Sequence, residues 1–164
     1  MEGDLPEAFE DVWRLLHVVL AAEAASGFGK LVDASPDRTS APLQQIVAEG
    51  RNLPPAAYGK ARTAQLELRA AFDTALQGFD ALLMVSTPGE APRGLADTGN
   101  AAFCAPWSFI GAPAITLPAG WSRNGLPLGL QLVGAWHRDL ALLRVAKWAE
   151  QALQWQGRPV DQER

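Results

Sequence analysis

Three residues could supply the nucleophile and the base of an acyl-transfer reaction: Ser86, Ser108 and His137. A serine hydroxyl becomes nucleophilic at neutral pH only when a base such as histidine lies beside it. Neither serine stands in a Gly-x-Ser-x-Gly turn, which positions the serine in many hydrolases. We therefore expect Ser86 to end a strand and His137 to lie on a loop. The sequence allows three hypotheses about function, of which two are given below. The third, a small Ser- or Cys-dependent hydrolase, has the least support.

Metal, phosphate and thiol chemistry have little support in the sequence. His17 and His137 have no ligand spacing between them, so we predict no metal site and no cofactor. The stretch 27–30 partly matches a phosphate-binding loop, but Leu31 stands where that motif needs Ser or Thr. Cys104 lies beside aromatic residues on a predicted helix, which favours a core position over a nucleophilic role.

Composition narrows the partners and the location. The net charge is −4 and no basic cluster is present, so nucleic acid is not an expected partner. A single cysteine excludes a disulfide within the chain and fits a reducing compartment. The N-terminus is acidic, unlike a secretory signal, and no apolar run reaches the roughly 18–20 residues that cross a bilayer. We expect a cytoplasmic protein without a membrane partner.

The residues before position 80 predict helices. Asp4 could cap a first helix whose apolar spacing ends at Gly27 and Gly29. A loop is expected over 33–42, followed by a short helix over 43–49 that Gly50 stops. A longer helix is expected from Pro54–Pro55 to about residue 77. The expected buried stripe of that longer helix is Leu68, Phe72, Ala75 and Phe79.

The residues after position 80 predict a small sheet with further helices. An unbroken apolar run over 81–85 indicates a strand buried on both faces, followed by an irregular stretch over 86–97. A short helix is expected through residue 110, capped by Thr98 or Asn100, with Pro106 near its first turn and Gly111 placed to end it. It precedes strands at 114–117 and 128–133 that are joined by an Asn-Gly turn. A last helix is expected over 139–153. This order predicts an α/β layered fold whose three strands leave open edges, so part of the domain could be missing.

Residues 80–134 carry a family resemblance. It rests on the apolar strand and Ser-Thr-Pro-Gly loop of 80–89, the Gly-x-Pro turn within Phe103–Pro118, and the Leu- and Gly-rich string Gly125–Gly134. These stretches resemble the C-terminal part of amidase-signature hydrolases, and the helical segment 4–78 fits more loosely. The resemblance implies a single domain over 1–164, with layered helices on a small mixed sheet. This domain would correspond to the C-terminal portion of an α/β/α sandwich.

The resemblance also implies a chemistry that this chain lacks. Enzymes of the family hydrolyse amides with a Ser–cis-Ser–Lys triad held in a Gly/Ser-rich segment, and the 164 residues contain no such run. We therefore assign no catalytic residue. Thr98, Phe103 and Trp107 match the part of the family that lines one wall of the acyl pocket. Ala101 replaces the Asp of glutamine-using members, which favours an amidase with an apolar substrate.

Two hypotheses follow from the resemblance and the open edges. The chain is either the C-terminal fragment or truncated relative of an amidase, inactive alone, or a stand-alone structural domain that self-associates. In the first case its partners would be a small-molecule amide in the complete enzyme and a missing N-terminal half. In the second case the partner would be a second copy in a homodimer.

Overall fold

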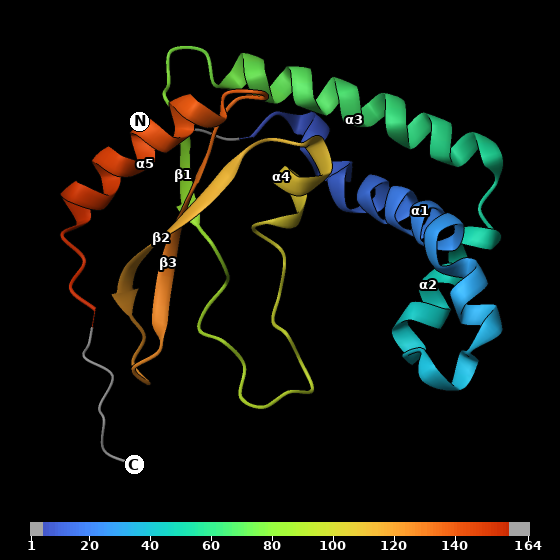
Figure 1. Cartoon of the computed structure of the whole chain (residues 1–164). Coiled ribbons are helices and arrows are strands. Elements are labelled where there is room, and N and C mark those ends of the chain that lie inside the picture. The colour runs from blue at the N-terminus through green and yellow to red at the C-terminus, as the bar shows by residue number, and fades with distance from the viewer. Residues whose placement is uncertain (1–4, 158–164) are drawn as a thin grey trace. The chain divides into compact units, whose positions relative to one another are not determined.

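The computed structural model describes residues 5–157, which form two compact units that divide between Ala75 and Leu76. The first unit is helical and the second is built on a sheet (Figure 1). The elements, in chain order, are a 3-10 helix (Glu7–Asp11), α1 (Val12–Ala34), a 3-10 turn (Pro36–Arg38), α2 (Ala41–Arg51), α3 (Pro55–Ala75), β1 (Leu82–Val85), α4 (Ala105–Ile110), β2 (Ala114–Trp121), β3 (Pro127–Val133) and α5 (Asp139–Leu153). The prediction of a single domain over 1–164 is not tested by this division. The cap predicted at Asp4 and the tail after Gly157 lie outside the described residues.

The first helix passes through the two glycines that were expected to end it. α1 continues through Gly27 and Gly29 to Ala34. The guanidinium of Arg51 explains the continuation, because it donates to the Gly29 carbonyl at 3.1 Å and to both carboxylate oxygens of Asp33 at 2.7 and 3.0 Å. The same contacts lower the pKa of Asp33, chiefly through the hydrogen bonds from Arg51. A side chain far along the sequence thus stabilises the last turns of α1.

α1 and α2 pack closely where α2 contains a glycine. A Cβ placed on Gly50 would lie 1.9 Å from the Ala21 carbonyl oxygen, so only glycine permits this approach. The predicted loop over 33–42 is in part wrong, because Ser40 accepts a hydrogen bond from the Leu43 amide and starts α2 at Ala41. α2 also runs past the predicted stop at Gly50 to Arg51.

The long third helix buries a narrower stripe than predicted. Leu68 and Phe72 are buried, and the Phe72 ring meets Phe9 edge to face with centroids 6.3 Å apart. Ala75 and Phe79 are exposed, so their place in the stripe was wrong. Phe79 lies outside the helix, because α3 ends at Ala75 and Gly78 turns the chain with a φ of +84°.

The continuous helical segment Glu7–Ala34 is long and apolar enough to span a bilayer, judged by length and composition alone. This differs from the expectation that no such segment exists. About a quarter of its most apolar stretch is buried, and α1 packs against α2 and α3. Core helices of soluble proteins share this length and composition, so the finding does not identify a membrane segment.

The sheet of the second unit is antiparallel throughout, where a mixed sheet was predicted. Its order is β1-β3-β2, with Leu83 opposite Leu132 and Ile115 opposite Leu132. Mixed pairing is absent among the described residues because β2 and β3 form a hairpin and β1 runs antiparallel to β3. The α/β character is confirmed, since helices accompany this small sheet.

The two faces of the sheet carry different helices. On one face Leu117 and Leu132 pack with Leu142 and Ala146 of α5. On the other face Met84, at the edge in β1, contacts Trp107 of α4. α5 begins and ends as predicted, with Arg144 and Lys147 exposed.

The first strand is only half covered, which corrects the prediction of burial on both faces. Leu83 is 59% exposed and Val85 is 46% exposed. Both side chains point to the α5 face, since Leu83 opposes Leu132 and Val85 opposes Leu130. α5 packs on β2 and β3, and β1 is left as an open edge.

Candidate functional site

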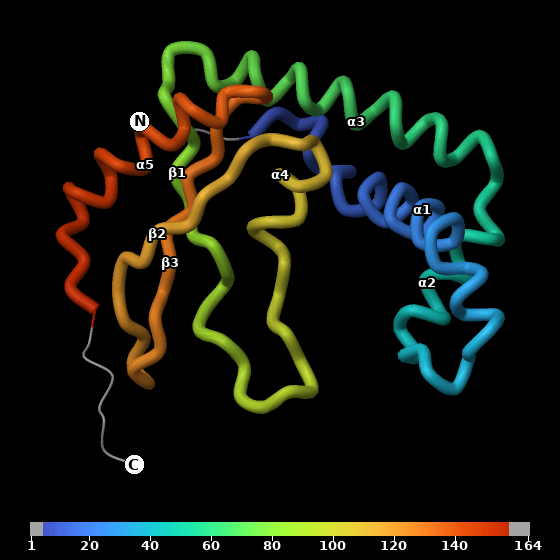
Figure 2. Tube along the Cα trace, in the orientation of Figure 1, coloured from blue at the N-terminus to red at the C-terminus, as the bar shows by residue number. Residues whose placement is uncertain are grey.

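The candidate site lies where the long connection 86–104 and α4 meet the sheet. This connection leaves β1, extends away from the sheet and returns to α4 (Figure 2). Residues 91–101 of the connection are exposed throughout. Hydrogen bonds to the β2–β3 hairpin hold the connection at three places.

The first of these places is a hydroxyl pair over a glycine. Ser86 donates through Oγ to the Thr116 hydroxyl at 3.1 Å, and its amide donates to the Gly129 carbonyl at 3.2 Å. A Cβ on Gly129 would lie 2.5 Å from Thr116 Cγ2 and 2.9 Å from Ser86 Oγ. Glycine at position 129 is therefore required for both side chains to meet across β3.

The same geometry separates Ser86 from His137. Ser86 bonds opposite Gly129 near one end of β3, whereas His137 follows the other end, beyond Val133. The four residue-to-residue steps from 129 to 133 span about 13 Å of strand. His137 stacks on Trp136 with ring centroids 3.7 Å apart, in a left-handed conformation with φ of 59°. Ser86 thus ends a strand and His137 lies on a loop, as predicted, and the two do not form a nucleophile–base pair.

The second place is Glu90, which sequence analysis missed. Its carboxylate accepts a short hydrogen bond from Asn124 Nδ2 at the β2–β3 turn. Hydrogen bonds from Ser122 and then Asn124 hold the pKa of the Glu90 carboxyl below its usual value. The turn itself is ordered, since Ser122 Oγ accepts from the amides of Asn124 and Leu126.

The third place is the return to α4. The buried Gln131 of β3 donates through Nε2 to the Phe103 carbonyl oxygen at 2.7 Å. Gln131 is a polar residue within an apolar string, and this was the available signal that it has a buried partner. The next residue, Cys104, precedes the first turn of α4.

The three predicted pocket residues occupy different environments. Thr98 is exposed on the connection, and Phe103 is half-buried. Trp107 is 1% exposed, and its Nε1 donates to the Met84 sulfur at 3.2 Å. Their role in a pocket wall stays a prediction.

The start of α4 differs from the predicted cap. Asn100 accepts from the Ala102 amide before the helix, and α4 begins later, after Cys104. Pro106 lies in the first turn and Gly111 ends the helix with φ of +72°, both as predicted. Cys104 is an exposed free thiol, so its predicted core position was wrong, because it lies at the helix start rather than on its buried side.

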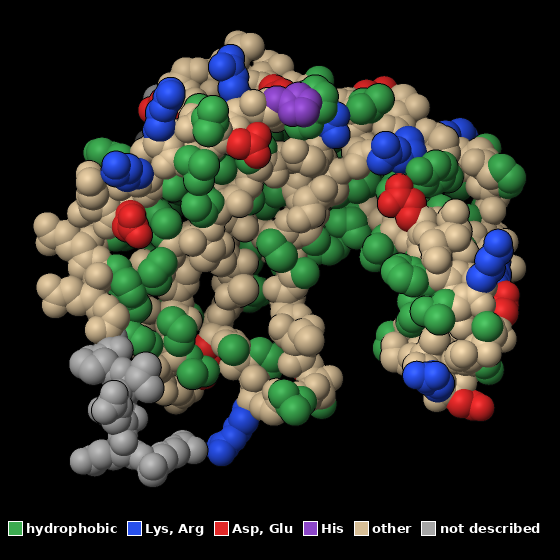
Figure 3. Space-filling view, viewed as in Figure 1, with side chains coloured by type: hydrophobic (Ala, Val, Ile, Leu, Met, Phe, Trp, Pro, Cys, Tyr) green, Lys and Arg blue, Asp and Glu red, His purple; other side chains and the backbone are tan. Residues whose placement is uncertain are grey.

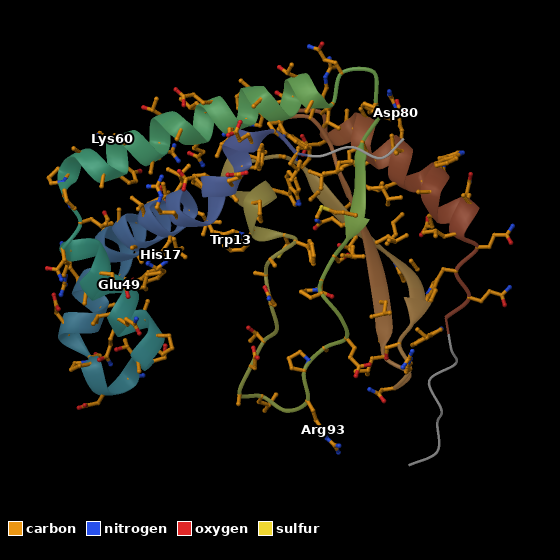
Figure 4. All side chains as sticks on the ribbon, turned by 180° about the vertical axis from the view of Figure 1, so that it is seen from behind. Trp13, His17, Glu49, Lys60, Asp80 and Arg93 are labelled. Atoms are coloured by element: carbon orange, nitrogen blue, oxygen red, sulfur yellow. The ribbon has the colours of Figure 1, made fainter. Side chains whose placement is uncertain are left out.

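His17 and Glu49 form an exposed pair in the first unit. His17 Nε2 lies 2.8 Å from Glu49 Oε2, and the two side chains face each other in Figure 4. Hydrogen bonds from Gln45 and His17 lower the pKa of Glu49. No group of three or more potential metal ligands occurs among residues 5–157. This pair is best explained as a surface contact between α1 and α2.

An open groove of about 790 Å³ lies on the α5 face of the second unit. Its walls are mostly apolar, with Leu83 and Leu130 from the sheet and Trp148 and Leu153 from α5, and Asp80 and Arg144 add charge. Trp148 is 69% exposed. Hydrophobic side chains gather around α5 in the space-filling view (Figure 3). The groove and the open β1 edge thus form one continuous apolar surface.

The sequence match identifies the family. Residues 6–143 match the model of the Amidase family, which is well over half of the chain. The chain therefore belongs to the amidase family, as its resemblance predicted.

Similar proteins extend beyond the length of this chain. A glutamyl-tRNA(Gln) amidotransferase subunit of Synechococcus sp. (strain WH7803) is 38% identical over 102 residues, which are 58% of this chain and 21% of that protein. A Rhodococcus erythropolis protein, the "uncharacterized protein in nthA 5'region", is 38% identical over 103 residues, or 56% of this chain and 51% of that one. The chain thus spans a fifth to a half of the length of these relatives.

Solved structures show the same fold. A crystal structure of an amidase shares 29% identity and a TM-score of 0.79, covering 91% of this chain and 36% of that one. Fatty acid amide hydrolase reaches a TM-score of 0.77 at 16% identity, which shows the fold alone. This chain corresponds to about one third of each solved chain.

Proposed function

We propose that these residues form the C-terminal portion of an amidase-signature hydrolase and do not hydrolyse amides by themselves. The observation that carries this proposal is a family match over residues 6–143 in a chain without the Gly/Ser-rich triad segment. In the complete enzyme this portion would support the pocket for a small-molecule amide.

The placement of the lysines supports inactivity. Lysine acts as a general base in sites that bury it and remove water from its ammonium group. The three lysines of the sequence, Lys30, Lys60 and Lys147, are all exposed on helices. Figure 4 labels Lys60 on α3. None of them lies in the kind of buried site that activates a serine pair.

The residue at position 101 bears on the substrate class of the complete enzyme. Ala101 stands where glutamine-using members of the family carry Asp, and a methyl group offers no partner for an amino-acid ammonium group. We infer an apolar amide rather than glutamine for the complete enzyme. We also infer a cytoplasmic location, because a chain with a single cysteine has no disulfide of its own and fits a reducing compartment.

The test is an assay of the purified 164-residue chain with 4-nitroanilides and 4-nitrophenyl esters. We expect product release at the rate of buffer alone, while a full-length amidase measured in parallel hydrolyses the same compounds. Release that scales with protein concentration and disappears in a single serine-to-alanine variant would overturn the proposal.

A second candidate is self-association through β1, and the exposed strand edge favours it. The four residues Leu82–Val85 are uncharged and lack proline, which usually protects an edge. Two antiparallel copies of β1 can pair about a two-fold axis, because such an interface needs only one surface. The apolar Leu83 and Val85 side chains would then be covered by their counterparts.

Light scattering across a concentration range tests this candidate. The wild-type chain is expected to approach twice the monomer mass, whereas Leu83→Lys places charge at the edge and keeps the monomer. Leu140→Lys is a matched control, because Leu140 is 73% exposed on α5 and is not among the groove residues. A wild-type monomer at all concentrations would exclude self-association.

A further inference from the structure

We infer that Glu90 is a positioning residue that holds the 86–104 connection, and with it Thr98 and Phe103, in the arrangement seen beside α4. The inference rests on the proposed function only for the statement that Thr98 and Phe103 line a substrate pocket. The restraint itself is argued from geometry and tested without substrate.

The β2–β3 hairpin offers the connection its three fixed points. At the start, Ser86 bonds to Thr116 and Gly129. At the end, the Phe103 carbonyl accepts from Gln131. Both ends of the connection are therefore held by strand residues. Without a further contact, the exposed stretch between them would be free to move, as exposed loops are.

Glu90 supplies the fixed point near the tip of the hairpin. Its carboxylate accepts a hydrogen bond from Nδ2 of Asn124 in the turn, which lies 34 positions away in sequence. The turn is a rigid partner for this contact, because Gly125 donates to the Ser122 carbonyl at 3.0 Å and Ser122 donates to the Leu126 carbonyl at 2.8 Å. A charged carboxylate is a stronger hydrogen-bond acceptor than a neutral group, so this single contact can restrain the connection.

Pro92 and Gly99 lie close together and connect the part of the loop held by Glu90 with the part that contains Thr98. Pro92 lies two positions after Glu90, and a Cβ on Gly99 would be only 3.6 Å from Pro92 Cδ. The outgoing and returning limbs of the connection therefore approach each other at Pro92 and Gly99. Asp97 accepts from the Gly99 amide at 2.8 Å, which orders the residues on both sides of Thr98.

Trypsin cleavage at Arg93 measures the restraint. Arg93 is the one basic residue in 86–104, and its side chain extends away from the connection in Figure 4. Cleavage gives fragments 1–93 and 94–164, which mass spectrometry identifies. When opening is faster than cleavage, the cleavage rate follows the population of the open loop.

We expect Glu90→Ala and Asn124→Ala each to raise cleavage at Arg93 by about three- to tenfold. The double variant should be no faster than the faster single variant, because both remove the same contact. Glu90→Gln keeps an acceptor oxygen and should restore most of the protection. Glu150→Ala, which removes an exposed carboxylate from α5, should leave the rate unchanged.

Several results would overturn the inference. Unchanged cleavage at Arg93 in Glu90→Ala would show that the carboxylate does not restrain the connection. Additive effects in the double variant would show that Glu90 and Asn124 act separately. If Glu90→Ala unfolds the chain, trypsin will also cleave faster at sites in α3 and α5. Cleavage at Arg93 in Glu90→Gln then tests the inference, and a rate as high as in Glu90→Ala would overturn it. Hydrolysis by the wild-type chain would contradict the proposed function but not this restraint.

Discussion

The indole Nε1 of Trp107 donates a hydrogen bond to the sulfur of Met84 at 3.2 Å and so joins α4 to the edge strand β1. Trp107 is 1% exposed, and Ile110 on the same helix is fully buried. A six-residue helix has little stability of its own, so packing of this kind must hold α4 in place.

Trp107→Ala should lower the free energy of unfolding by about 3–5 kcal/mol, because it leaves a large cavity and removes the contact with Met84. Urea unfolding followed by circular dichroism measures this change. Trp148→Ala is the matched control, since Trp148 is 69% exposed, and it should cost less than about 1 kcal/mol. Equal costs for the two variants would contradict the packing described for α4.

Gly129→Ala should destabilise the chain by about 1–3 kcal/mol, because the added methyl group overlaps Thr116 Cγ2. Adding Thr116→Ser removes that methyl group and should restore part of the loss. Gly120→Ala is the control in the adjacent strand, where a Cβ meets nothing within 4 Å. Thermal unfolding of these variants checks the expectation, and no recovery in the double variant would refute it.

Two helical glycines should respond in opposite ways to alanine. Gly50→Ala places a Cβ 1.9 Å from the Ala21 carbonyl oxygen and should separate α1 from α2, at a cost of about 2–4 kcal/mol. Gly27→Ala meets nothing within 4 Å and should stabilise α1 by up to about 1 kcal/mol. Chemical denaturation measures both. A stabilising Gly50→Ala would contradict the close crossing of the two helices.

Acid should loosen the 86–104 connection. The pKa of Glu90 is lowered in the folded chain, so its contribution is complete above the ordinary value near 4.5 and is lost as the pH falls through the folded value. Arg93 and Asp97 in the connection and Arg123 in the turn are the other charged groups nearby in sequence. A spin label on Cys104, the sole cysteine, should become more mobile below about pH 4.5 in the wild type. The transition should be weaker in Glu90→Gln, and an identical transition in both would count against the assignment.

Local signals in the sequence predicted much of the fold. The structure confirms the last helix over 139–153, Pro106 and Gly111 at the two ends of α4, and the Asn-Gly turn between β2 and β3. Each of these predictions depended on residues that are near in sequence. The turn differs in detail, since only Gly125 has positive φ there. Long-range contacts caused the errors. α1 passes its glycines because Arg51 binds its last turns from another helix, and Leu83 is exposed because α5 packs elsewhere.

The candidate site was predicted less completely. Thr98, Phe103 and Trp107 came from family resemblance, and their pocket role is still untested. Glu90 gave no signal, because a lone glutamate in an exposed stretch is ordinary, and its partner Asn124 lies 34 positions away. Only the folded hairpin brings the two together.

A serine-reactive fluorophosphonate tests the central claim most directly, because it labels only a hydroxyl that the protein activates. The intact mass of the full chain would be measured after incubation, with a full-length amidase as the positive control. The account predicts an unchanged mass, since Ser86 bonds to the Thr116 hydroxyl and Ser108 is exposed on α4. A single adduct on Ser86 or Ser108 would contradict the proposal that these residues form an inactive portion of an amidase.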